Sequence, residues 1–332
     1  MRQRGFHLTE LVIALGLGLL LVAAFLTALQ RCRTLFATHE SLARLQDAGR
    51  HALSVLVPDL EHAGFYGFTP PRATRLLRGD VPVADSAQLL QPLPGASPTP
   101  AAGLPAGAHA CGVNFAVDLT RAVQGSNNSY ALDCVPTASA GGARAGSDTL
   151  TLRHASLAVA APHSGRIQLY SRRLESQTTV DLFADGRPPG PSSLDREIRD
   201  LEVRTYYVAN NSVDRPGWPA LRVKALTESR GAAQFRDEEI LPGVEDLQVE
   251  FGIAGSGGAV HVRFVPADFA GLESSAVVAV RFWLRLRSDS TESGFRDDRP
   301  LDYADVHFAP TPLEATQRRL LIERTVALRN LP

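Results

Sequence analysis

Three cysteines carry the most reactive side chains of this 332-residue chain: Cys32, Cys111 and Cys134. They form no C-x-x-C pair, and no histidine pair stands near enough to complete a zinc site, so metal binding through sulfur is not expected. If the bulk of the chain lies outside the cytoplasm, Cys111 and Cys134 are the expected disulfide pair, because Cys32 is far from both in the sequence. A closed loop of that size stabilises a fold by about 3 kcal/mol.

Acidic and histidine side chains are the other candidate metal ligands. Four carboxylates lie close together near the C-terminus: Asp297, Asp298, Asp302 and Asp305. Their spacing is not that of an EF-hand loop, so a solvated loop is expected and calcium binding is left open. Three histidines of one predicted helix are too far apart for the i, i+4 spacing of a metal-binding pair: His39, His51 and His62. No cofactor is predicted.

Motifs that would support catalysis are missing from the sequence. There is no G-x-S-x-G elbow, no H-E-x-x-H and no phosphate-binding G-x-x-x-x-G-K-[ST]. The acidic run from Asp237 to Glu239 is expected to be surface charge, and the glycine-rich residues 255–258 a hairpin connection. An enzyme is therefore not predicted, and a membrane-tethered hydrolase would need a cluster of titratable groups in a cleft.

Composition indicates a globular protein without a strong overall electrostatic field. Hydrophobic residues make up 44% and charged residues 21% of the chain, and the formal net charge is −1. These values exclude a disordered tail and give no general attraction to nucleic acid or anionic lipid. Nucleic acid is therefore an unlikely partner on charge alone.

The N-terminal region contains a stretch that is long and apolar enough to cross a membrane. No charged side chain occurs in residues 11–29, which approaches the roughly 20 residues that a spanning helix needs. Arg2 and Arg4 precede this stretch and should hold the N-terminus in the cytoplasm, with the rest of the chain outside. A secretory signal is disfavoured because no clean A-x-A site follows. Glu10 stands at the start of the span, where a carboxylate is costly and needs a partner.

The run from Arg4 to Leu15 (RGFHLTELVIAL) resembles the class III leader of type IV prepilins and pseudopilins. By that resemblance a prepilin peptidase cuts after Gly5 and methylates Phe6, and Glu10 becomes the fifth residue of the mature chain. In a bundle with little water, the carboxylate of Glu10 would neutralise the amine of Phe6 on an adjacent subunit.

The helix is predicted to continue beyond the membrane. Apolar residues recur at spacings of three, four and seven, with charged residues mostly between them: Leu35, Leu42, Leu45, Ala48, Ala52, Leu56 and Leu60. One amphipathic helix from Phe6 to about His62 follows, with bends expected at Gly49 and Pro58 and a stop at Gly64.

The remaining chain reads as an exported β-rich domain. Short alternating runs predict strands over residues 113–119, 148–153, 167–171, 198–208, 221–226, 246–253, 260–264, 278–288 and 320–328. In 278–288, Arg281, Arg285 and Arg287 share one face of the strand, which is predicted to be exposed to solvent. The expected fold class is α+β, with a long N-terminal helix packed on a largely antiparallel sheet, as in type IV pilin-like proteins.

The expected organisation has four parts: a leader over 1–5, a transmembrane or pilus-core half of the helix over 6–30, an exposed amphipathic half over 31–64, and an exported domain over 65–332, with a proline-, glycine- and alanine-rich loop over 80–110. Cys32 falls just past the span. It is expected to be a buried thiol at the membrane edge, with an intersubunit disulfide as the alternative.

Four blocks of the predicted body resemble PilW-type minor pilins: residues 63–67, 147–153, 241–252 and 324–330. The resemblance implies a subunit that primes type IV pilus assembly with other minor pilins and the major pilin, after processing by a prepilin peptidase. It implies a place in the bacterial inner membrane with the body in the periplasm, and then in the pilus, where a tip adhesin is a further candidate partner. The alternatives are a J-like pseudopilin of type II secretion, or a DNA-binding or adhesive pilin.

The leader assignment predicts the N-terminus of the mature protein. When the full-length chain is co-expressed with a prepilin peptidase, mass spectrometry should find a product that begins at methylated Phe6. Without the peptidase, Met1 should be retained. An intact Met1 in both cultures, or a cut beyond Ala24, would contradict the assignment.

Overall fold

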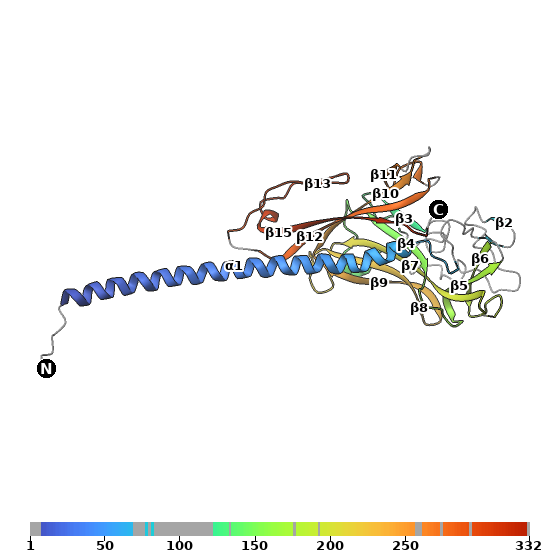
Figure 1. Cartoon of the computed structure of the whole chain (residues 1–332), viewed down its shortest axis with the longest axis horizontal. Coiled ribbons are helices and arrows are strands. Elements are labelled where there is room, and N and C mark those ends of the chain that lie inside the picture. Colours follow the sequence, from blue (N-terminus) through green and yellow to red (C-terminus); the bar gives the residue numbers. More distant parts are fainter. Residues whose placement is uncertain are drawn as a thin grey trace.

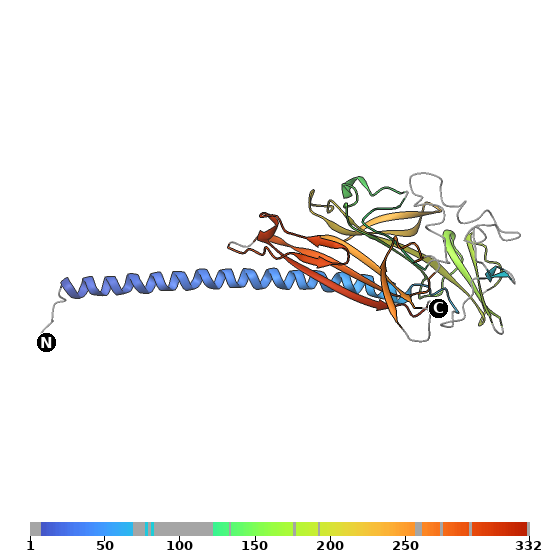
Figure 2. The same ribbon diagram turned by 90° about the horizontal axis from the view of Figure 1, so that it is seen from above.

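The chain consists of one long helix and a β-rich body (Figure 1). The computed structural model describes residues 8–68, 77–78, 81–82, 122–132, 134–174, 177–191, 193–255, 261–272, 275–291 and 294–330. Helix α1 spans Leu8–His62, which is 55 residues. Its first half projects away from the body, and its second half lies along it (Figures 1 and 2).

Helix α1 is continuous through both positions at which a bend was expected. Gly49 instead permits close packing, because a Cβ at this position would lie 2.5 Å from Cδ1 of Ile322. Pro58 lies inside the helix, one turn before its end. The helix ends at His62, and Gly64 then adopts a φ of +79°, a conformation that favours glycine. The stop at Gly64 was predicted correctly.

A four-stranded antiparallel sheet forms one wall of the body, in the order β11-β10-β12-β15. Its strands are β10 (Val244–Ala254), β11 (Val262–Pro266), β12 (Val277–Thr291) and β15 (Gln317–Ala327). Strands β12 and β15 make the most extensive contacts with α1 and run alongside its second half in both ribbon views.

A seven-stranded sheet forms the other wall, in the order β3-β4-β7-β5-β6, with β8 paired to β7 and β9 paired to β8. Its strands are β3 (Val123–Ser126), β4 (Thr149–Ala155), β5 (Ser164–Leu174), β6 (Gln177–Asp185), β7 (Arg196–Ala209), β8 (Ala220–Ser229) and β9 (Ala232–Pro242). Strand β7 pairs with β5 near its start and with β8 near its end, so the sheet forks there.

Smaller elements complete the described chain. They are the hairpin β1 (Leu77–Arg78) and β2 (Val81–Pro82), the hairpin β13 (Leu301–Tyr303) and β14 (Val306–Phe308), and the 3-10 turns η1 (Ala138–Ala140) and η3 (Glu314–Thr316). The α+β architecture predicted from the sequence, with a long N-terminal helix on antiparallel sheets, is thereby confirmed.

One core joins the helix to both sheets. From α1 it takes Leu45, Ala52, Leu56 and Leu60, each at most 5% exposed. These residues are seven or four positions apart and so occupy one face of the helix. They share a cluster with Tyr206 of the larger sheet and with residues of β10 and β12. Burial of each leucine contributes about 1.5–3 kcal/mol. Leu35, predicted on the same face, is 59% exposed, because contact with the body begins only near residue 41.

A buried acidic residue near the end of α1 ties the helix to the larger sheet. Asp59 accepts a hydrogen bond from Nη1 of Arg204 at 2.6 Å and another from the hydroxyl of Tyr206. Nε2 of His154 lies 3.8 Å from its carboxylate. Burial alone would raise the pKa of Asp59, but His154 and Arg204 bring it below its ordinary value. Burial alone would lower the pKa of His154, but Asp59 raises it. Each shift favours the charged form of its group.

Eight of the nine predicted strands are found within the described residues, and the run 113–119 lies outside them. The arginine face of β12 is not exposed to solvent, however, and this prediction was wrong. Arg285 is 5% exposed, because the segment that carries β13 and β14 covers it. The acidic run also differs from its prediction, since the Asp237 side chain is only 3% exposed.

Asp148 connects the two sheets through its backbone and its side chain. Its amide donates to the carbonyl of Leu247 at 2.8 Å, and its carboxylate accepts the amides of Asn128 at 2.7 Å and Val249 at 2.8 Å. The residue is 1% exposed. Burial raises the pKa of Asp148 from 3.8 to about 7. The two amide hydrogen bonds lower this pKa, and the negative charge of Asp305 raises it further.

This raised pKa predicts a pH-dependent stability. The folded chain holds the proton of Asp148 more tightly than the unfolded chain, so the free energy of unfolding should fall as pH rises from 3.8 to about 7. In Asp148→Asn this fall should be smaller, by an amount on the order of a few kcal/mol. Urea unfolding across this range would measure it, with exposed Asp214→Asn as the control. Equal slopes in wild type and Asp148→Asn would contradict the prediction.

Candidate functional site

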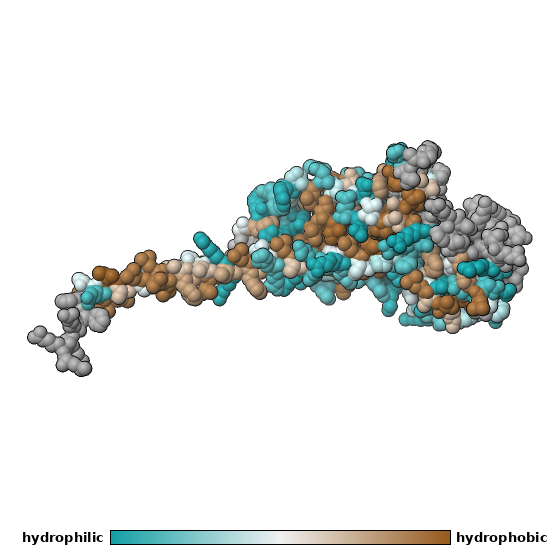
Figure 3. All heavy atoms as spheres, viewed as in Figure 1, coloured by the Kyte–Doolittle hydropathy of each residue, from teal (hydrophilic) through white to brown (hydrophobic). Residues whose placement is uncertain are grey.

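The first half of α1 presents an apolar surface around its whole circumference. Every residue in 8–33 is exposed except Gly18, which is partly buried. The large side chains are widely open, with Leu15 at 60%, Leu19 at 70% and Phe25 at 63% exposed. Figure 3 shows this projecting segment as a largely brown, hydrophobic rod. A helix that is hydrophobic all round needs lipid or other helices around it.

A shallow apolar hollow lies on this segment beside Gly18. It is lined by Leu11, Ala14, Leu15, Gly18, Leu19 and Val22. A Cβ placed on Gly16 or Gly18 would meet no atom within 4 Å. The two glycines therefore relieve no clash within the chain, and the hollow leaves room for the close approach of another helix.

Glu10 lies in the first turn of α1, at the far end of the apolar segment from the body. It is exposed, and an acidic residue in the first turn is favourable for the helix dipole. The predicted cleavage and methylation residues Gly5 and Phe6 lie outside the described residues. The roles assigned to all three residues stay predictions.

The cysteines differ in state. Cys32 is a free thiol that is exposed in the single chain, on the projecting part of α1. Its expected burial at the membrane edge stays a prediction. Cys134 is 6% exposed and disulfide-bonded. Its predicted partner, Cys111, lies outside the described residues, so the pair Cys111–Cys134 stays a prediction.

Arginines of the smaller sheet surround one carboxylate, Glu245, which is 1% exposed. Nε of Arg319 lies 2.8 Å from this carboxylate, Nε of Arg285 3.2 Å and Nη1 of Arg287 3.7 Å. The guanidinium of Arg285 also stacks 3.8 Å above the ring of Phe308 in β14. Burial lowers the pKa of Arg287. These cations are occupied inside the protein and do not form a free basic surface.

A second buried charge cluster holds the segment that contains Cys134 against the larger sheet. Asp237 accepts from Nε of Arg222 at 2.8 Å and lies 3.2 Å from Nζ of Lys224. It also accepts the amide of Thr137 at 3.1 Å, and Lys224 donates to the carbonyl of Val135 at 2.8 Å. Sequence reasoning missed this cluster, because the pairing of Lys224 with the acidic run appears only when β8 and β9 form a hairpin.

The four C-terminal carboxylates do not converge on one point. Asp297 pairs with Arg299 at 2.7 Å, Asp298 with Arg296 at 2.6 Å, and Asp302 with His307 at 2.5 Å. Asp305 instead accepts hydrogen bonds from the side chains of Asn127 and Asn128. Within the part of the chain that the structure describes, no group of three or more acidic, histidine or cysteine side chains is arranged to hold a metal ion.

Comparison with known proteins connects the body to pilus assembly. Residues 205–330, from within β7 to just past β15, match the family model of type IV pilus-assembly protein W. The resemblance found in the sequence is confirmed over this part, and the match supports a pilin role. A solved type IV-like pilin from Thermus thermophilus is 14% identical, over 59% of this chain and 83% of that one, with a TM-score of 0.28. That score is too low to establish a common fold. No curated protein matches the chain.

The Glu245 cluster predicts where the body is most sensitive to loss of a charge. Glu245→Ala leaves buried arginines without their anion and should lower the free energy of unfolding by about 3–5 kcal/mol. Glu323→Ala is the matched control, because Glu323 lies on the same sheet with its side chain 57% exposed and should cost no more than about 1 kcal/mol. Urea unfolding of the full chain in detergent would measure both. Equal losses would contradict the prediction.

Proposed function

We propose, on the match of residues 205–330 to the pilus-assembly family, that this chain is a non-enzymatic minor pilin that helps to prime assembly of a type IV pilus. One observation carries the proposal: a single helix has one half with a face buried in the body and one half apolar and exposed on every side. The exposed half would anchor the protein in the inner membrane. It would then move into the helical core of the pilus, carrying the body with it.

Glu10 would set the register of this insertion. Its place in the first turn of the exposed helix suits a contact with the amine of Phe6 on an adjacent subunit, once the leader up to Gly5 has been removed. The attraction between opposite charges is stronger in a bundle that excludes water than in solvent. An unpaired carboxylate in such a bundle is costly. Pairing would therefore favour one axial offset between neighbouring helices.

The partners that the family resemblance implies are compatible with this geometry. Other minor pilins and the major pilin would cover the apolar half, and a prepilin peptidase would process the leader. Before assembly the body would lie in the periplasm, where the disulfide state of Cys134 fits an oxidising compartment.

Two alternatives use the same anchor. A J-like pseudopilin of type II secretion would insert in the same way and differ in the machine that it serves. A DNA-binding or adhesive pilin is less well supported, because Arg285, Arg287 and Arg319 face Glu245 instead of solvent. Phosphate binding would require these cations to leave a buried anion.

The proposal predicts separate effects of Glu10 on processing and assembly. In Glu10→Ala the leader should still be removed, whereas the amount of the protein in sheared pili, and the number of pili in a strain that depends on it, should fall about tenfold or more. Glu40→Ala is the control, because Glu40 is an exposed carboxylate of the same helix that pairs only with Arg44 in the described chain. Immunoblots of cell and pilus fractions would measure both. Normal incorporation of cleaved Glu10→Ala would refute the proposed role.

A further inference from the structure

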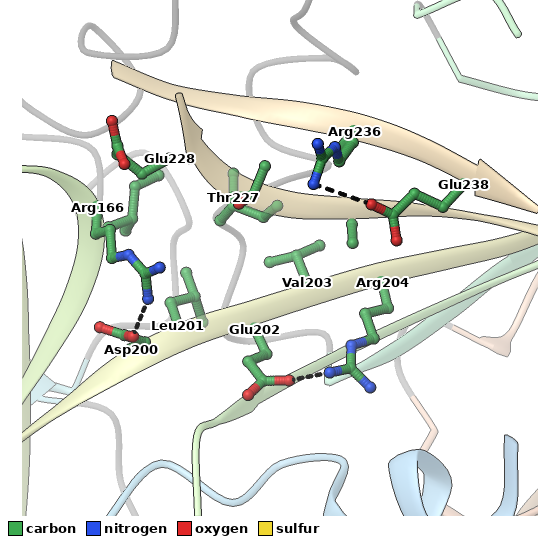
Figure 4. Close-up of a pocket in the computed structure, with 13 residues that line it drawn as sticks. Arg166, Asp200, Leu201, Glu202, Val203, Arg204, Thr227, Glu228, Arg236 and Glu238 are labelled. Atoms are coloured by element: carbon green, nitrogen blue, oxygen red, sulfur yellow. Dashed lines mark hydrogen bonds and ion pairs between the residues drawn. The ribbon is translucent and has the colours of Figure 1, made fainter. Parts of the chain in front are cut away.

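The charged side chains of the cleft shown in Figure 4 are largely paired with one another. Arg166 lies 2.6 Å from Asp200, and Arg236 lies 3.2 Å from Glu238. Leu201, which also lines the cleft, is 3% exposed and packed into the core. This cleft therefore selects no ligand. An open surface is found instead at the end of the body that lies toward the apolar half of α1.

Strand β15 runs alongside α1 in the same direction, so its first residue lies toward the apolar half. Near the middle of the strand Ile322 packs against Gly49, and beyond its end Asn330 donates a hydrogen bond to the carbonyl of Glu61 at 3.0 Å. Gln317 begins the strand five positions before Ile322, about 17 Å nearer the apolar half. At about 1.5 Å per helical residue, the start of β15 is therefore level with about residue 38 of α1.

The turn η3, just before β15, presents an exposed leucine. Leu313, which flanks the turn on its N-terminal side, is 79% exposed, whereas Ala315 within the turn is 0% exposed. Thr311 donates to the carboxylate of Glu314 from its amide at 2.8 Å and from its hydroxyl at 2.7 Å. These hydrogen bonds hold the backbone on either side of Leu313, so its side chain is presented to the outside by an ordered turn.

The segment that leads to β13 lies beside this turn. The amide of Asp297 donates to the carbonyl of Ala315 at 2.9 Å, and the guanidinium of Arg318 stacks 4.0 Å above the ring of Phe295. Figures 1 and 2 show this red part of the body reaching along α1 toward its N-terminus. Residues 294–299 and 311–318 together carry three arginines and three acidic residues, so this surface has no net charge.

A second exposed leucine stands on the same side of α1. Leu35 is 59% exposed, and it precedes Gly49 by 14 residues, which is close to four helical turns. It therefore faces the side of α1 on which β15 packs, nearer the apolar half than the body reaches. Leu29 ends the uncharged stretch only about 9 Å of helix further on.

We propose that this end of the body rests on the membrane surface, with Leu313 and Leu35 in the lipid headgroup layer beside the anchor. The partner is a phospholipid surface, and the contact is a second one besides the span itself. The inference rests on the proposed function in one respect, because it takes residues 11–29 as the membrane span.

Distance supports a lipid partner. In an upright helix the start of β15 lies about 13 Å beyond Leu29, and the headgroup layer accounts for about 5–7 Å of this distance. Membrane helices tilt by about 20° on average, and a tilt toward β15 lowers the turn η3 to the headgroups. Interfacial side chains are among the features that set such a tilt, and Leu313 and Leu35 are placed to do so.

The chemistry of the surface fits the same partner. Exposed leucines gain by leaving water at the boundary of the acyl chains. The side chains of Arg296 and Arg299 are 60% and 84% exposed, so they remain among polar headgroups when the leucines insert. Because the surface has no net charge, the contact does not depend on an excess of anionic lipid.

The test places a fluorescent nitrobenzoxadiazole probe at single positions of the full chain in phospholipid vesicles. The free thiol is removed with Cys32→Ser, and Leu313→Cys, Leu194→Cys or Phe25→Cys then supplies the site of labelling. Leu194 is the matched control. It is also an exposed leucine, but it precedes β7, whose Tyr206 contacts the last turn of α1. It therefore lies at the opposite end of the body, whereas Phe25 reports on the span.

Quenching by nitroxide lipids measures the depth of each probe. Lipids with a headgroup nitroxide should remove about half of the emission at position 313 and less than about a tenth at position 194, because only a probe in the headgroup layer meets the nitroxide. Lipids with an acyl-chain nitroxide should quench the probe at position 25. The same quenching at 313 is expected in vesicles of phosphatidylcholine alone and in vesicles that also contain phosphatidylglycerol.

The outcomes separate this inference from the proposed function. Quenching at position 25 without quenching at 313 would overturn the inference and leave the anchor intact, and so would equal quenching at 313 and 194. A blue shift of the emission at 313 without lipid quenching would also overturn it, because another copy of the chain would then cover the surface. Absence of quenching at position 25 would refute both the inference and the proposed anchor.

Discussion

The burial of one face of the second half of α1 is the constraint on which the rest of the structure depends. Leu45, Ala52, Leu56 and Leu60 fill the space between two sheets that share one core with them. Asp59 adds a charged hydrogen-bonded contact to Arg204 at the same end of the helix. Because the helix is continuous, this docking fixes the direction in which its apolar first half leaves the body.

The two halves of the helix therefore suit different surroundings. The apolar half has no cover within the described chain, whereas the other half has one face buried in the core and the opposite face exposed. One continuous helix joins the two halves, so no loop separates the apolar half from the body. The body supports this with buried ion clusters at Glu245 and Asp237, which hold its covering segments against the sheets.

Much of the fold was accessible from the sequence because its signals are local. The alternation of apolar and polar residues in 278–288 predicted β12. The spacing of apolar residues up to residue 60 predicted the helix, and Gly64 predicted its end. Strands β6 and β9 were missed because burial of their side chains depends on neighbours distant in the chain. The arginine face of β12 was misjudged for the same reason, since the segment that covers Arg285 arrives with β13 and β14.

By itself the sequence determined the apolar anchor, the acidic residue at its start, the long helix and the antiparallel strands, because charge, hydropathy and periodicity act between residues close in the chain. Only the tertiary structure decided which charges are buried and which are free. It brought Arg222 to Asp237 and several arginines to Glu245. Such pairings join residues far apart in sequence, and their energy depends on burial that no local pattern reveals.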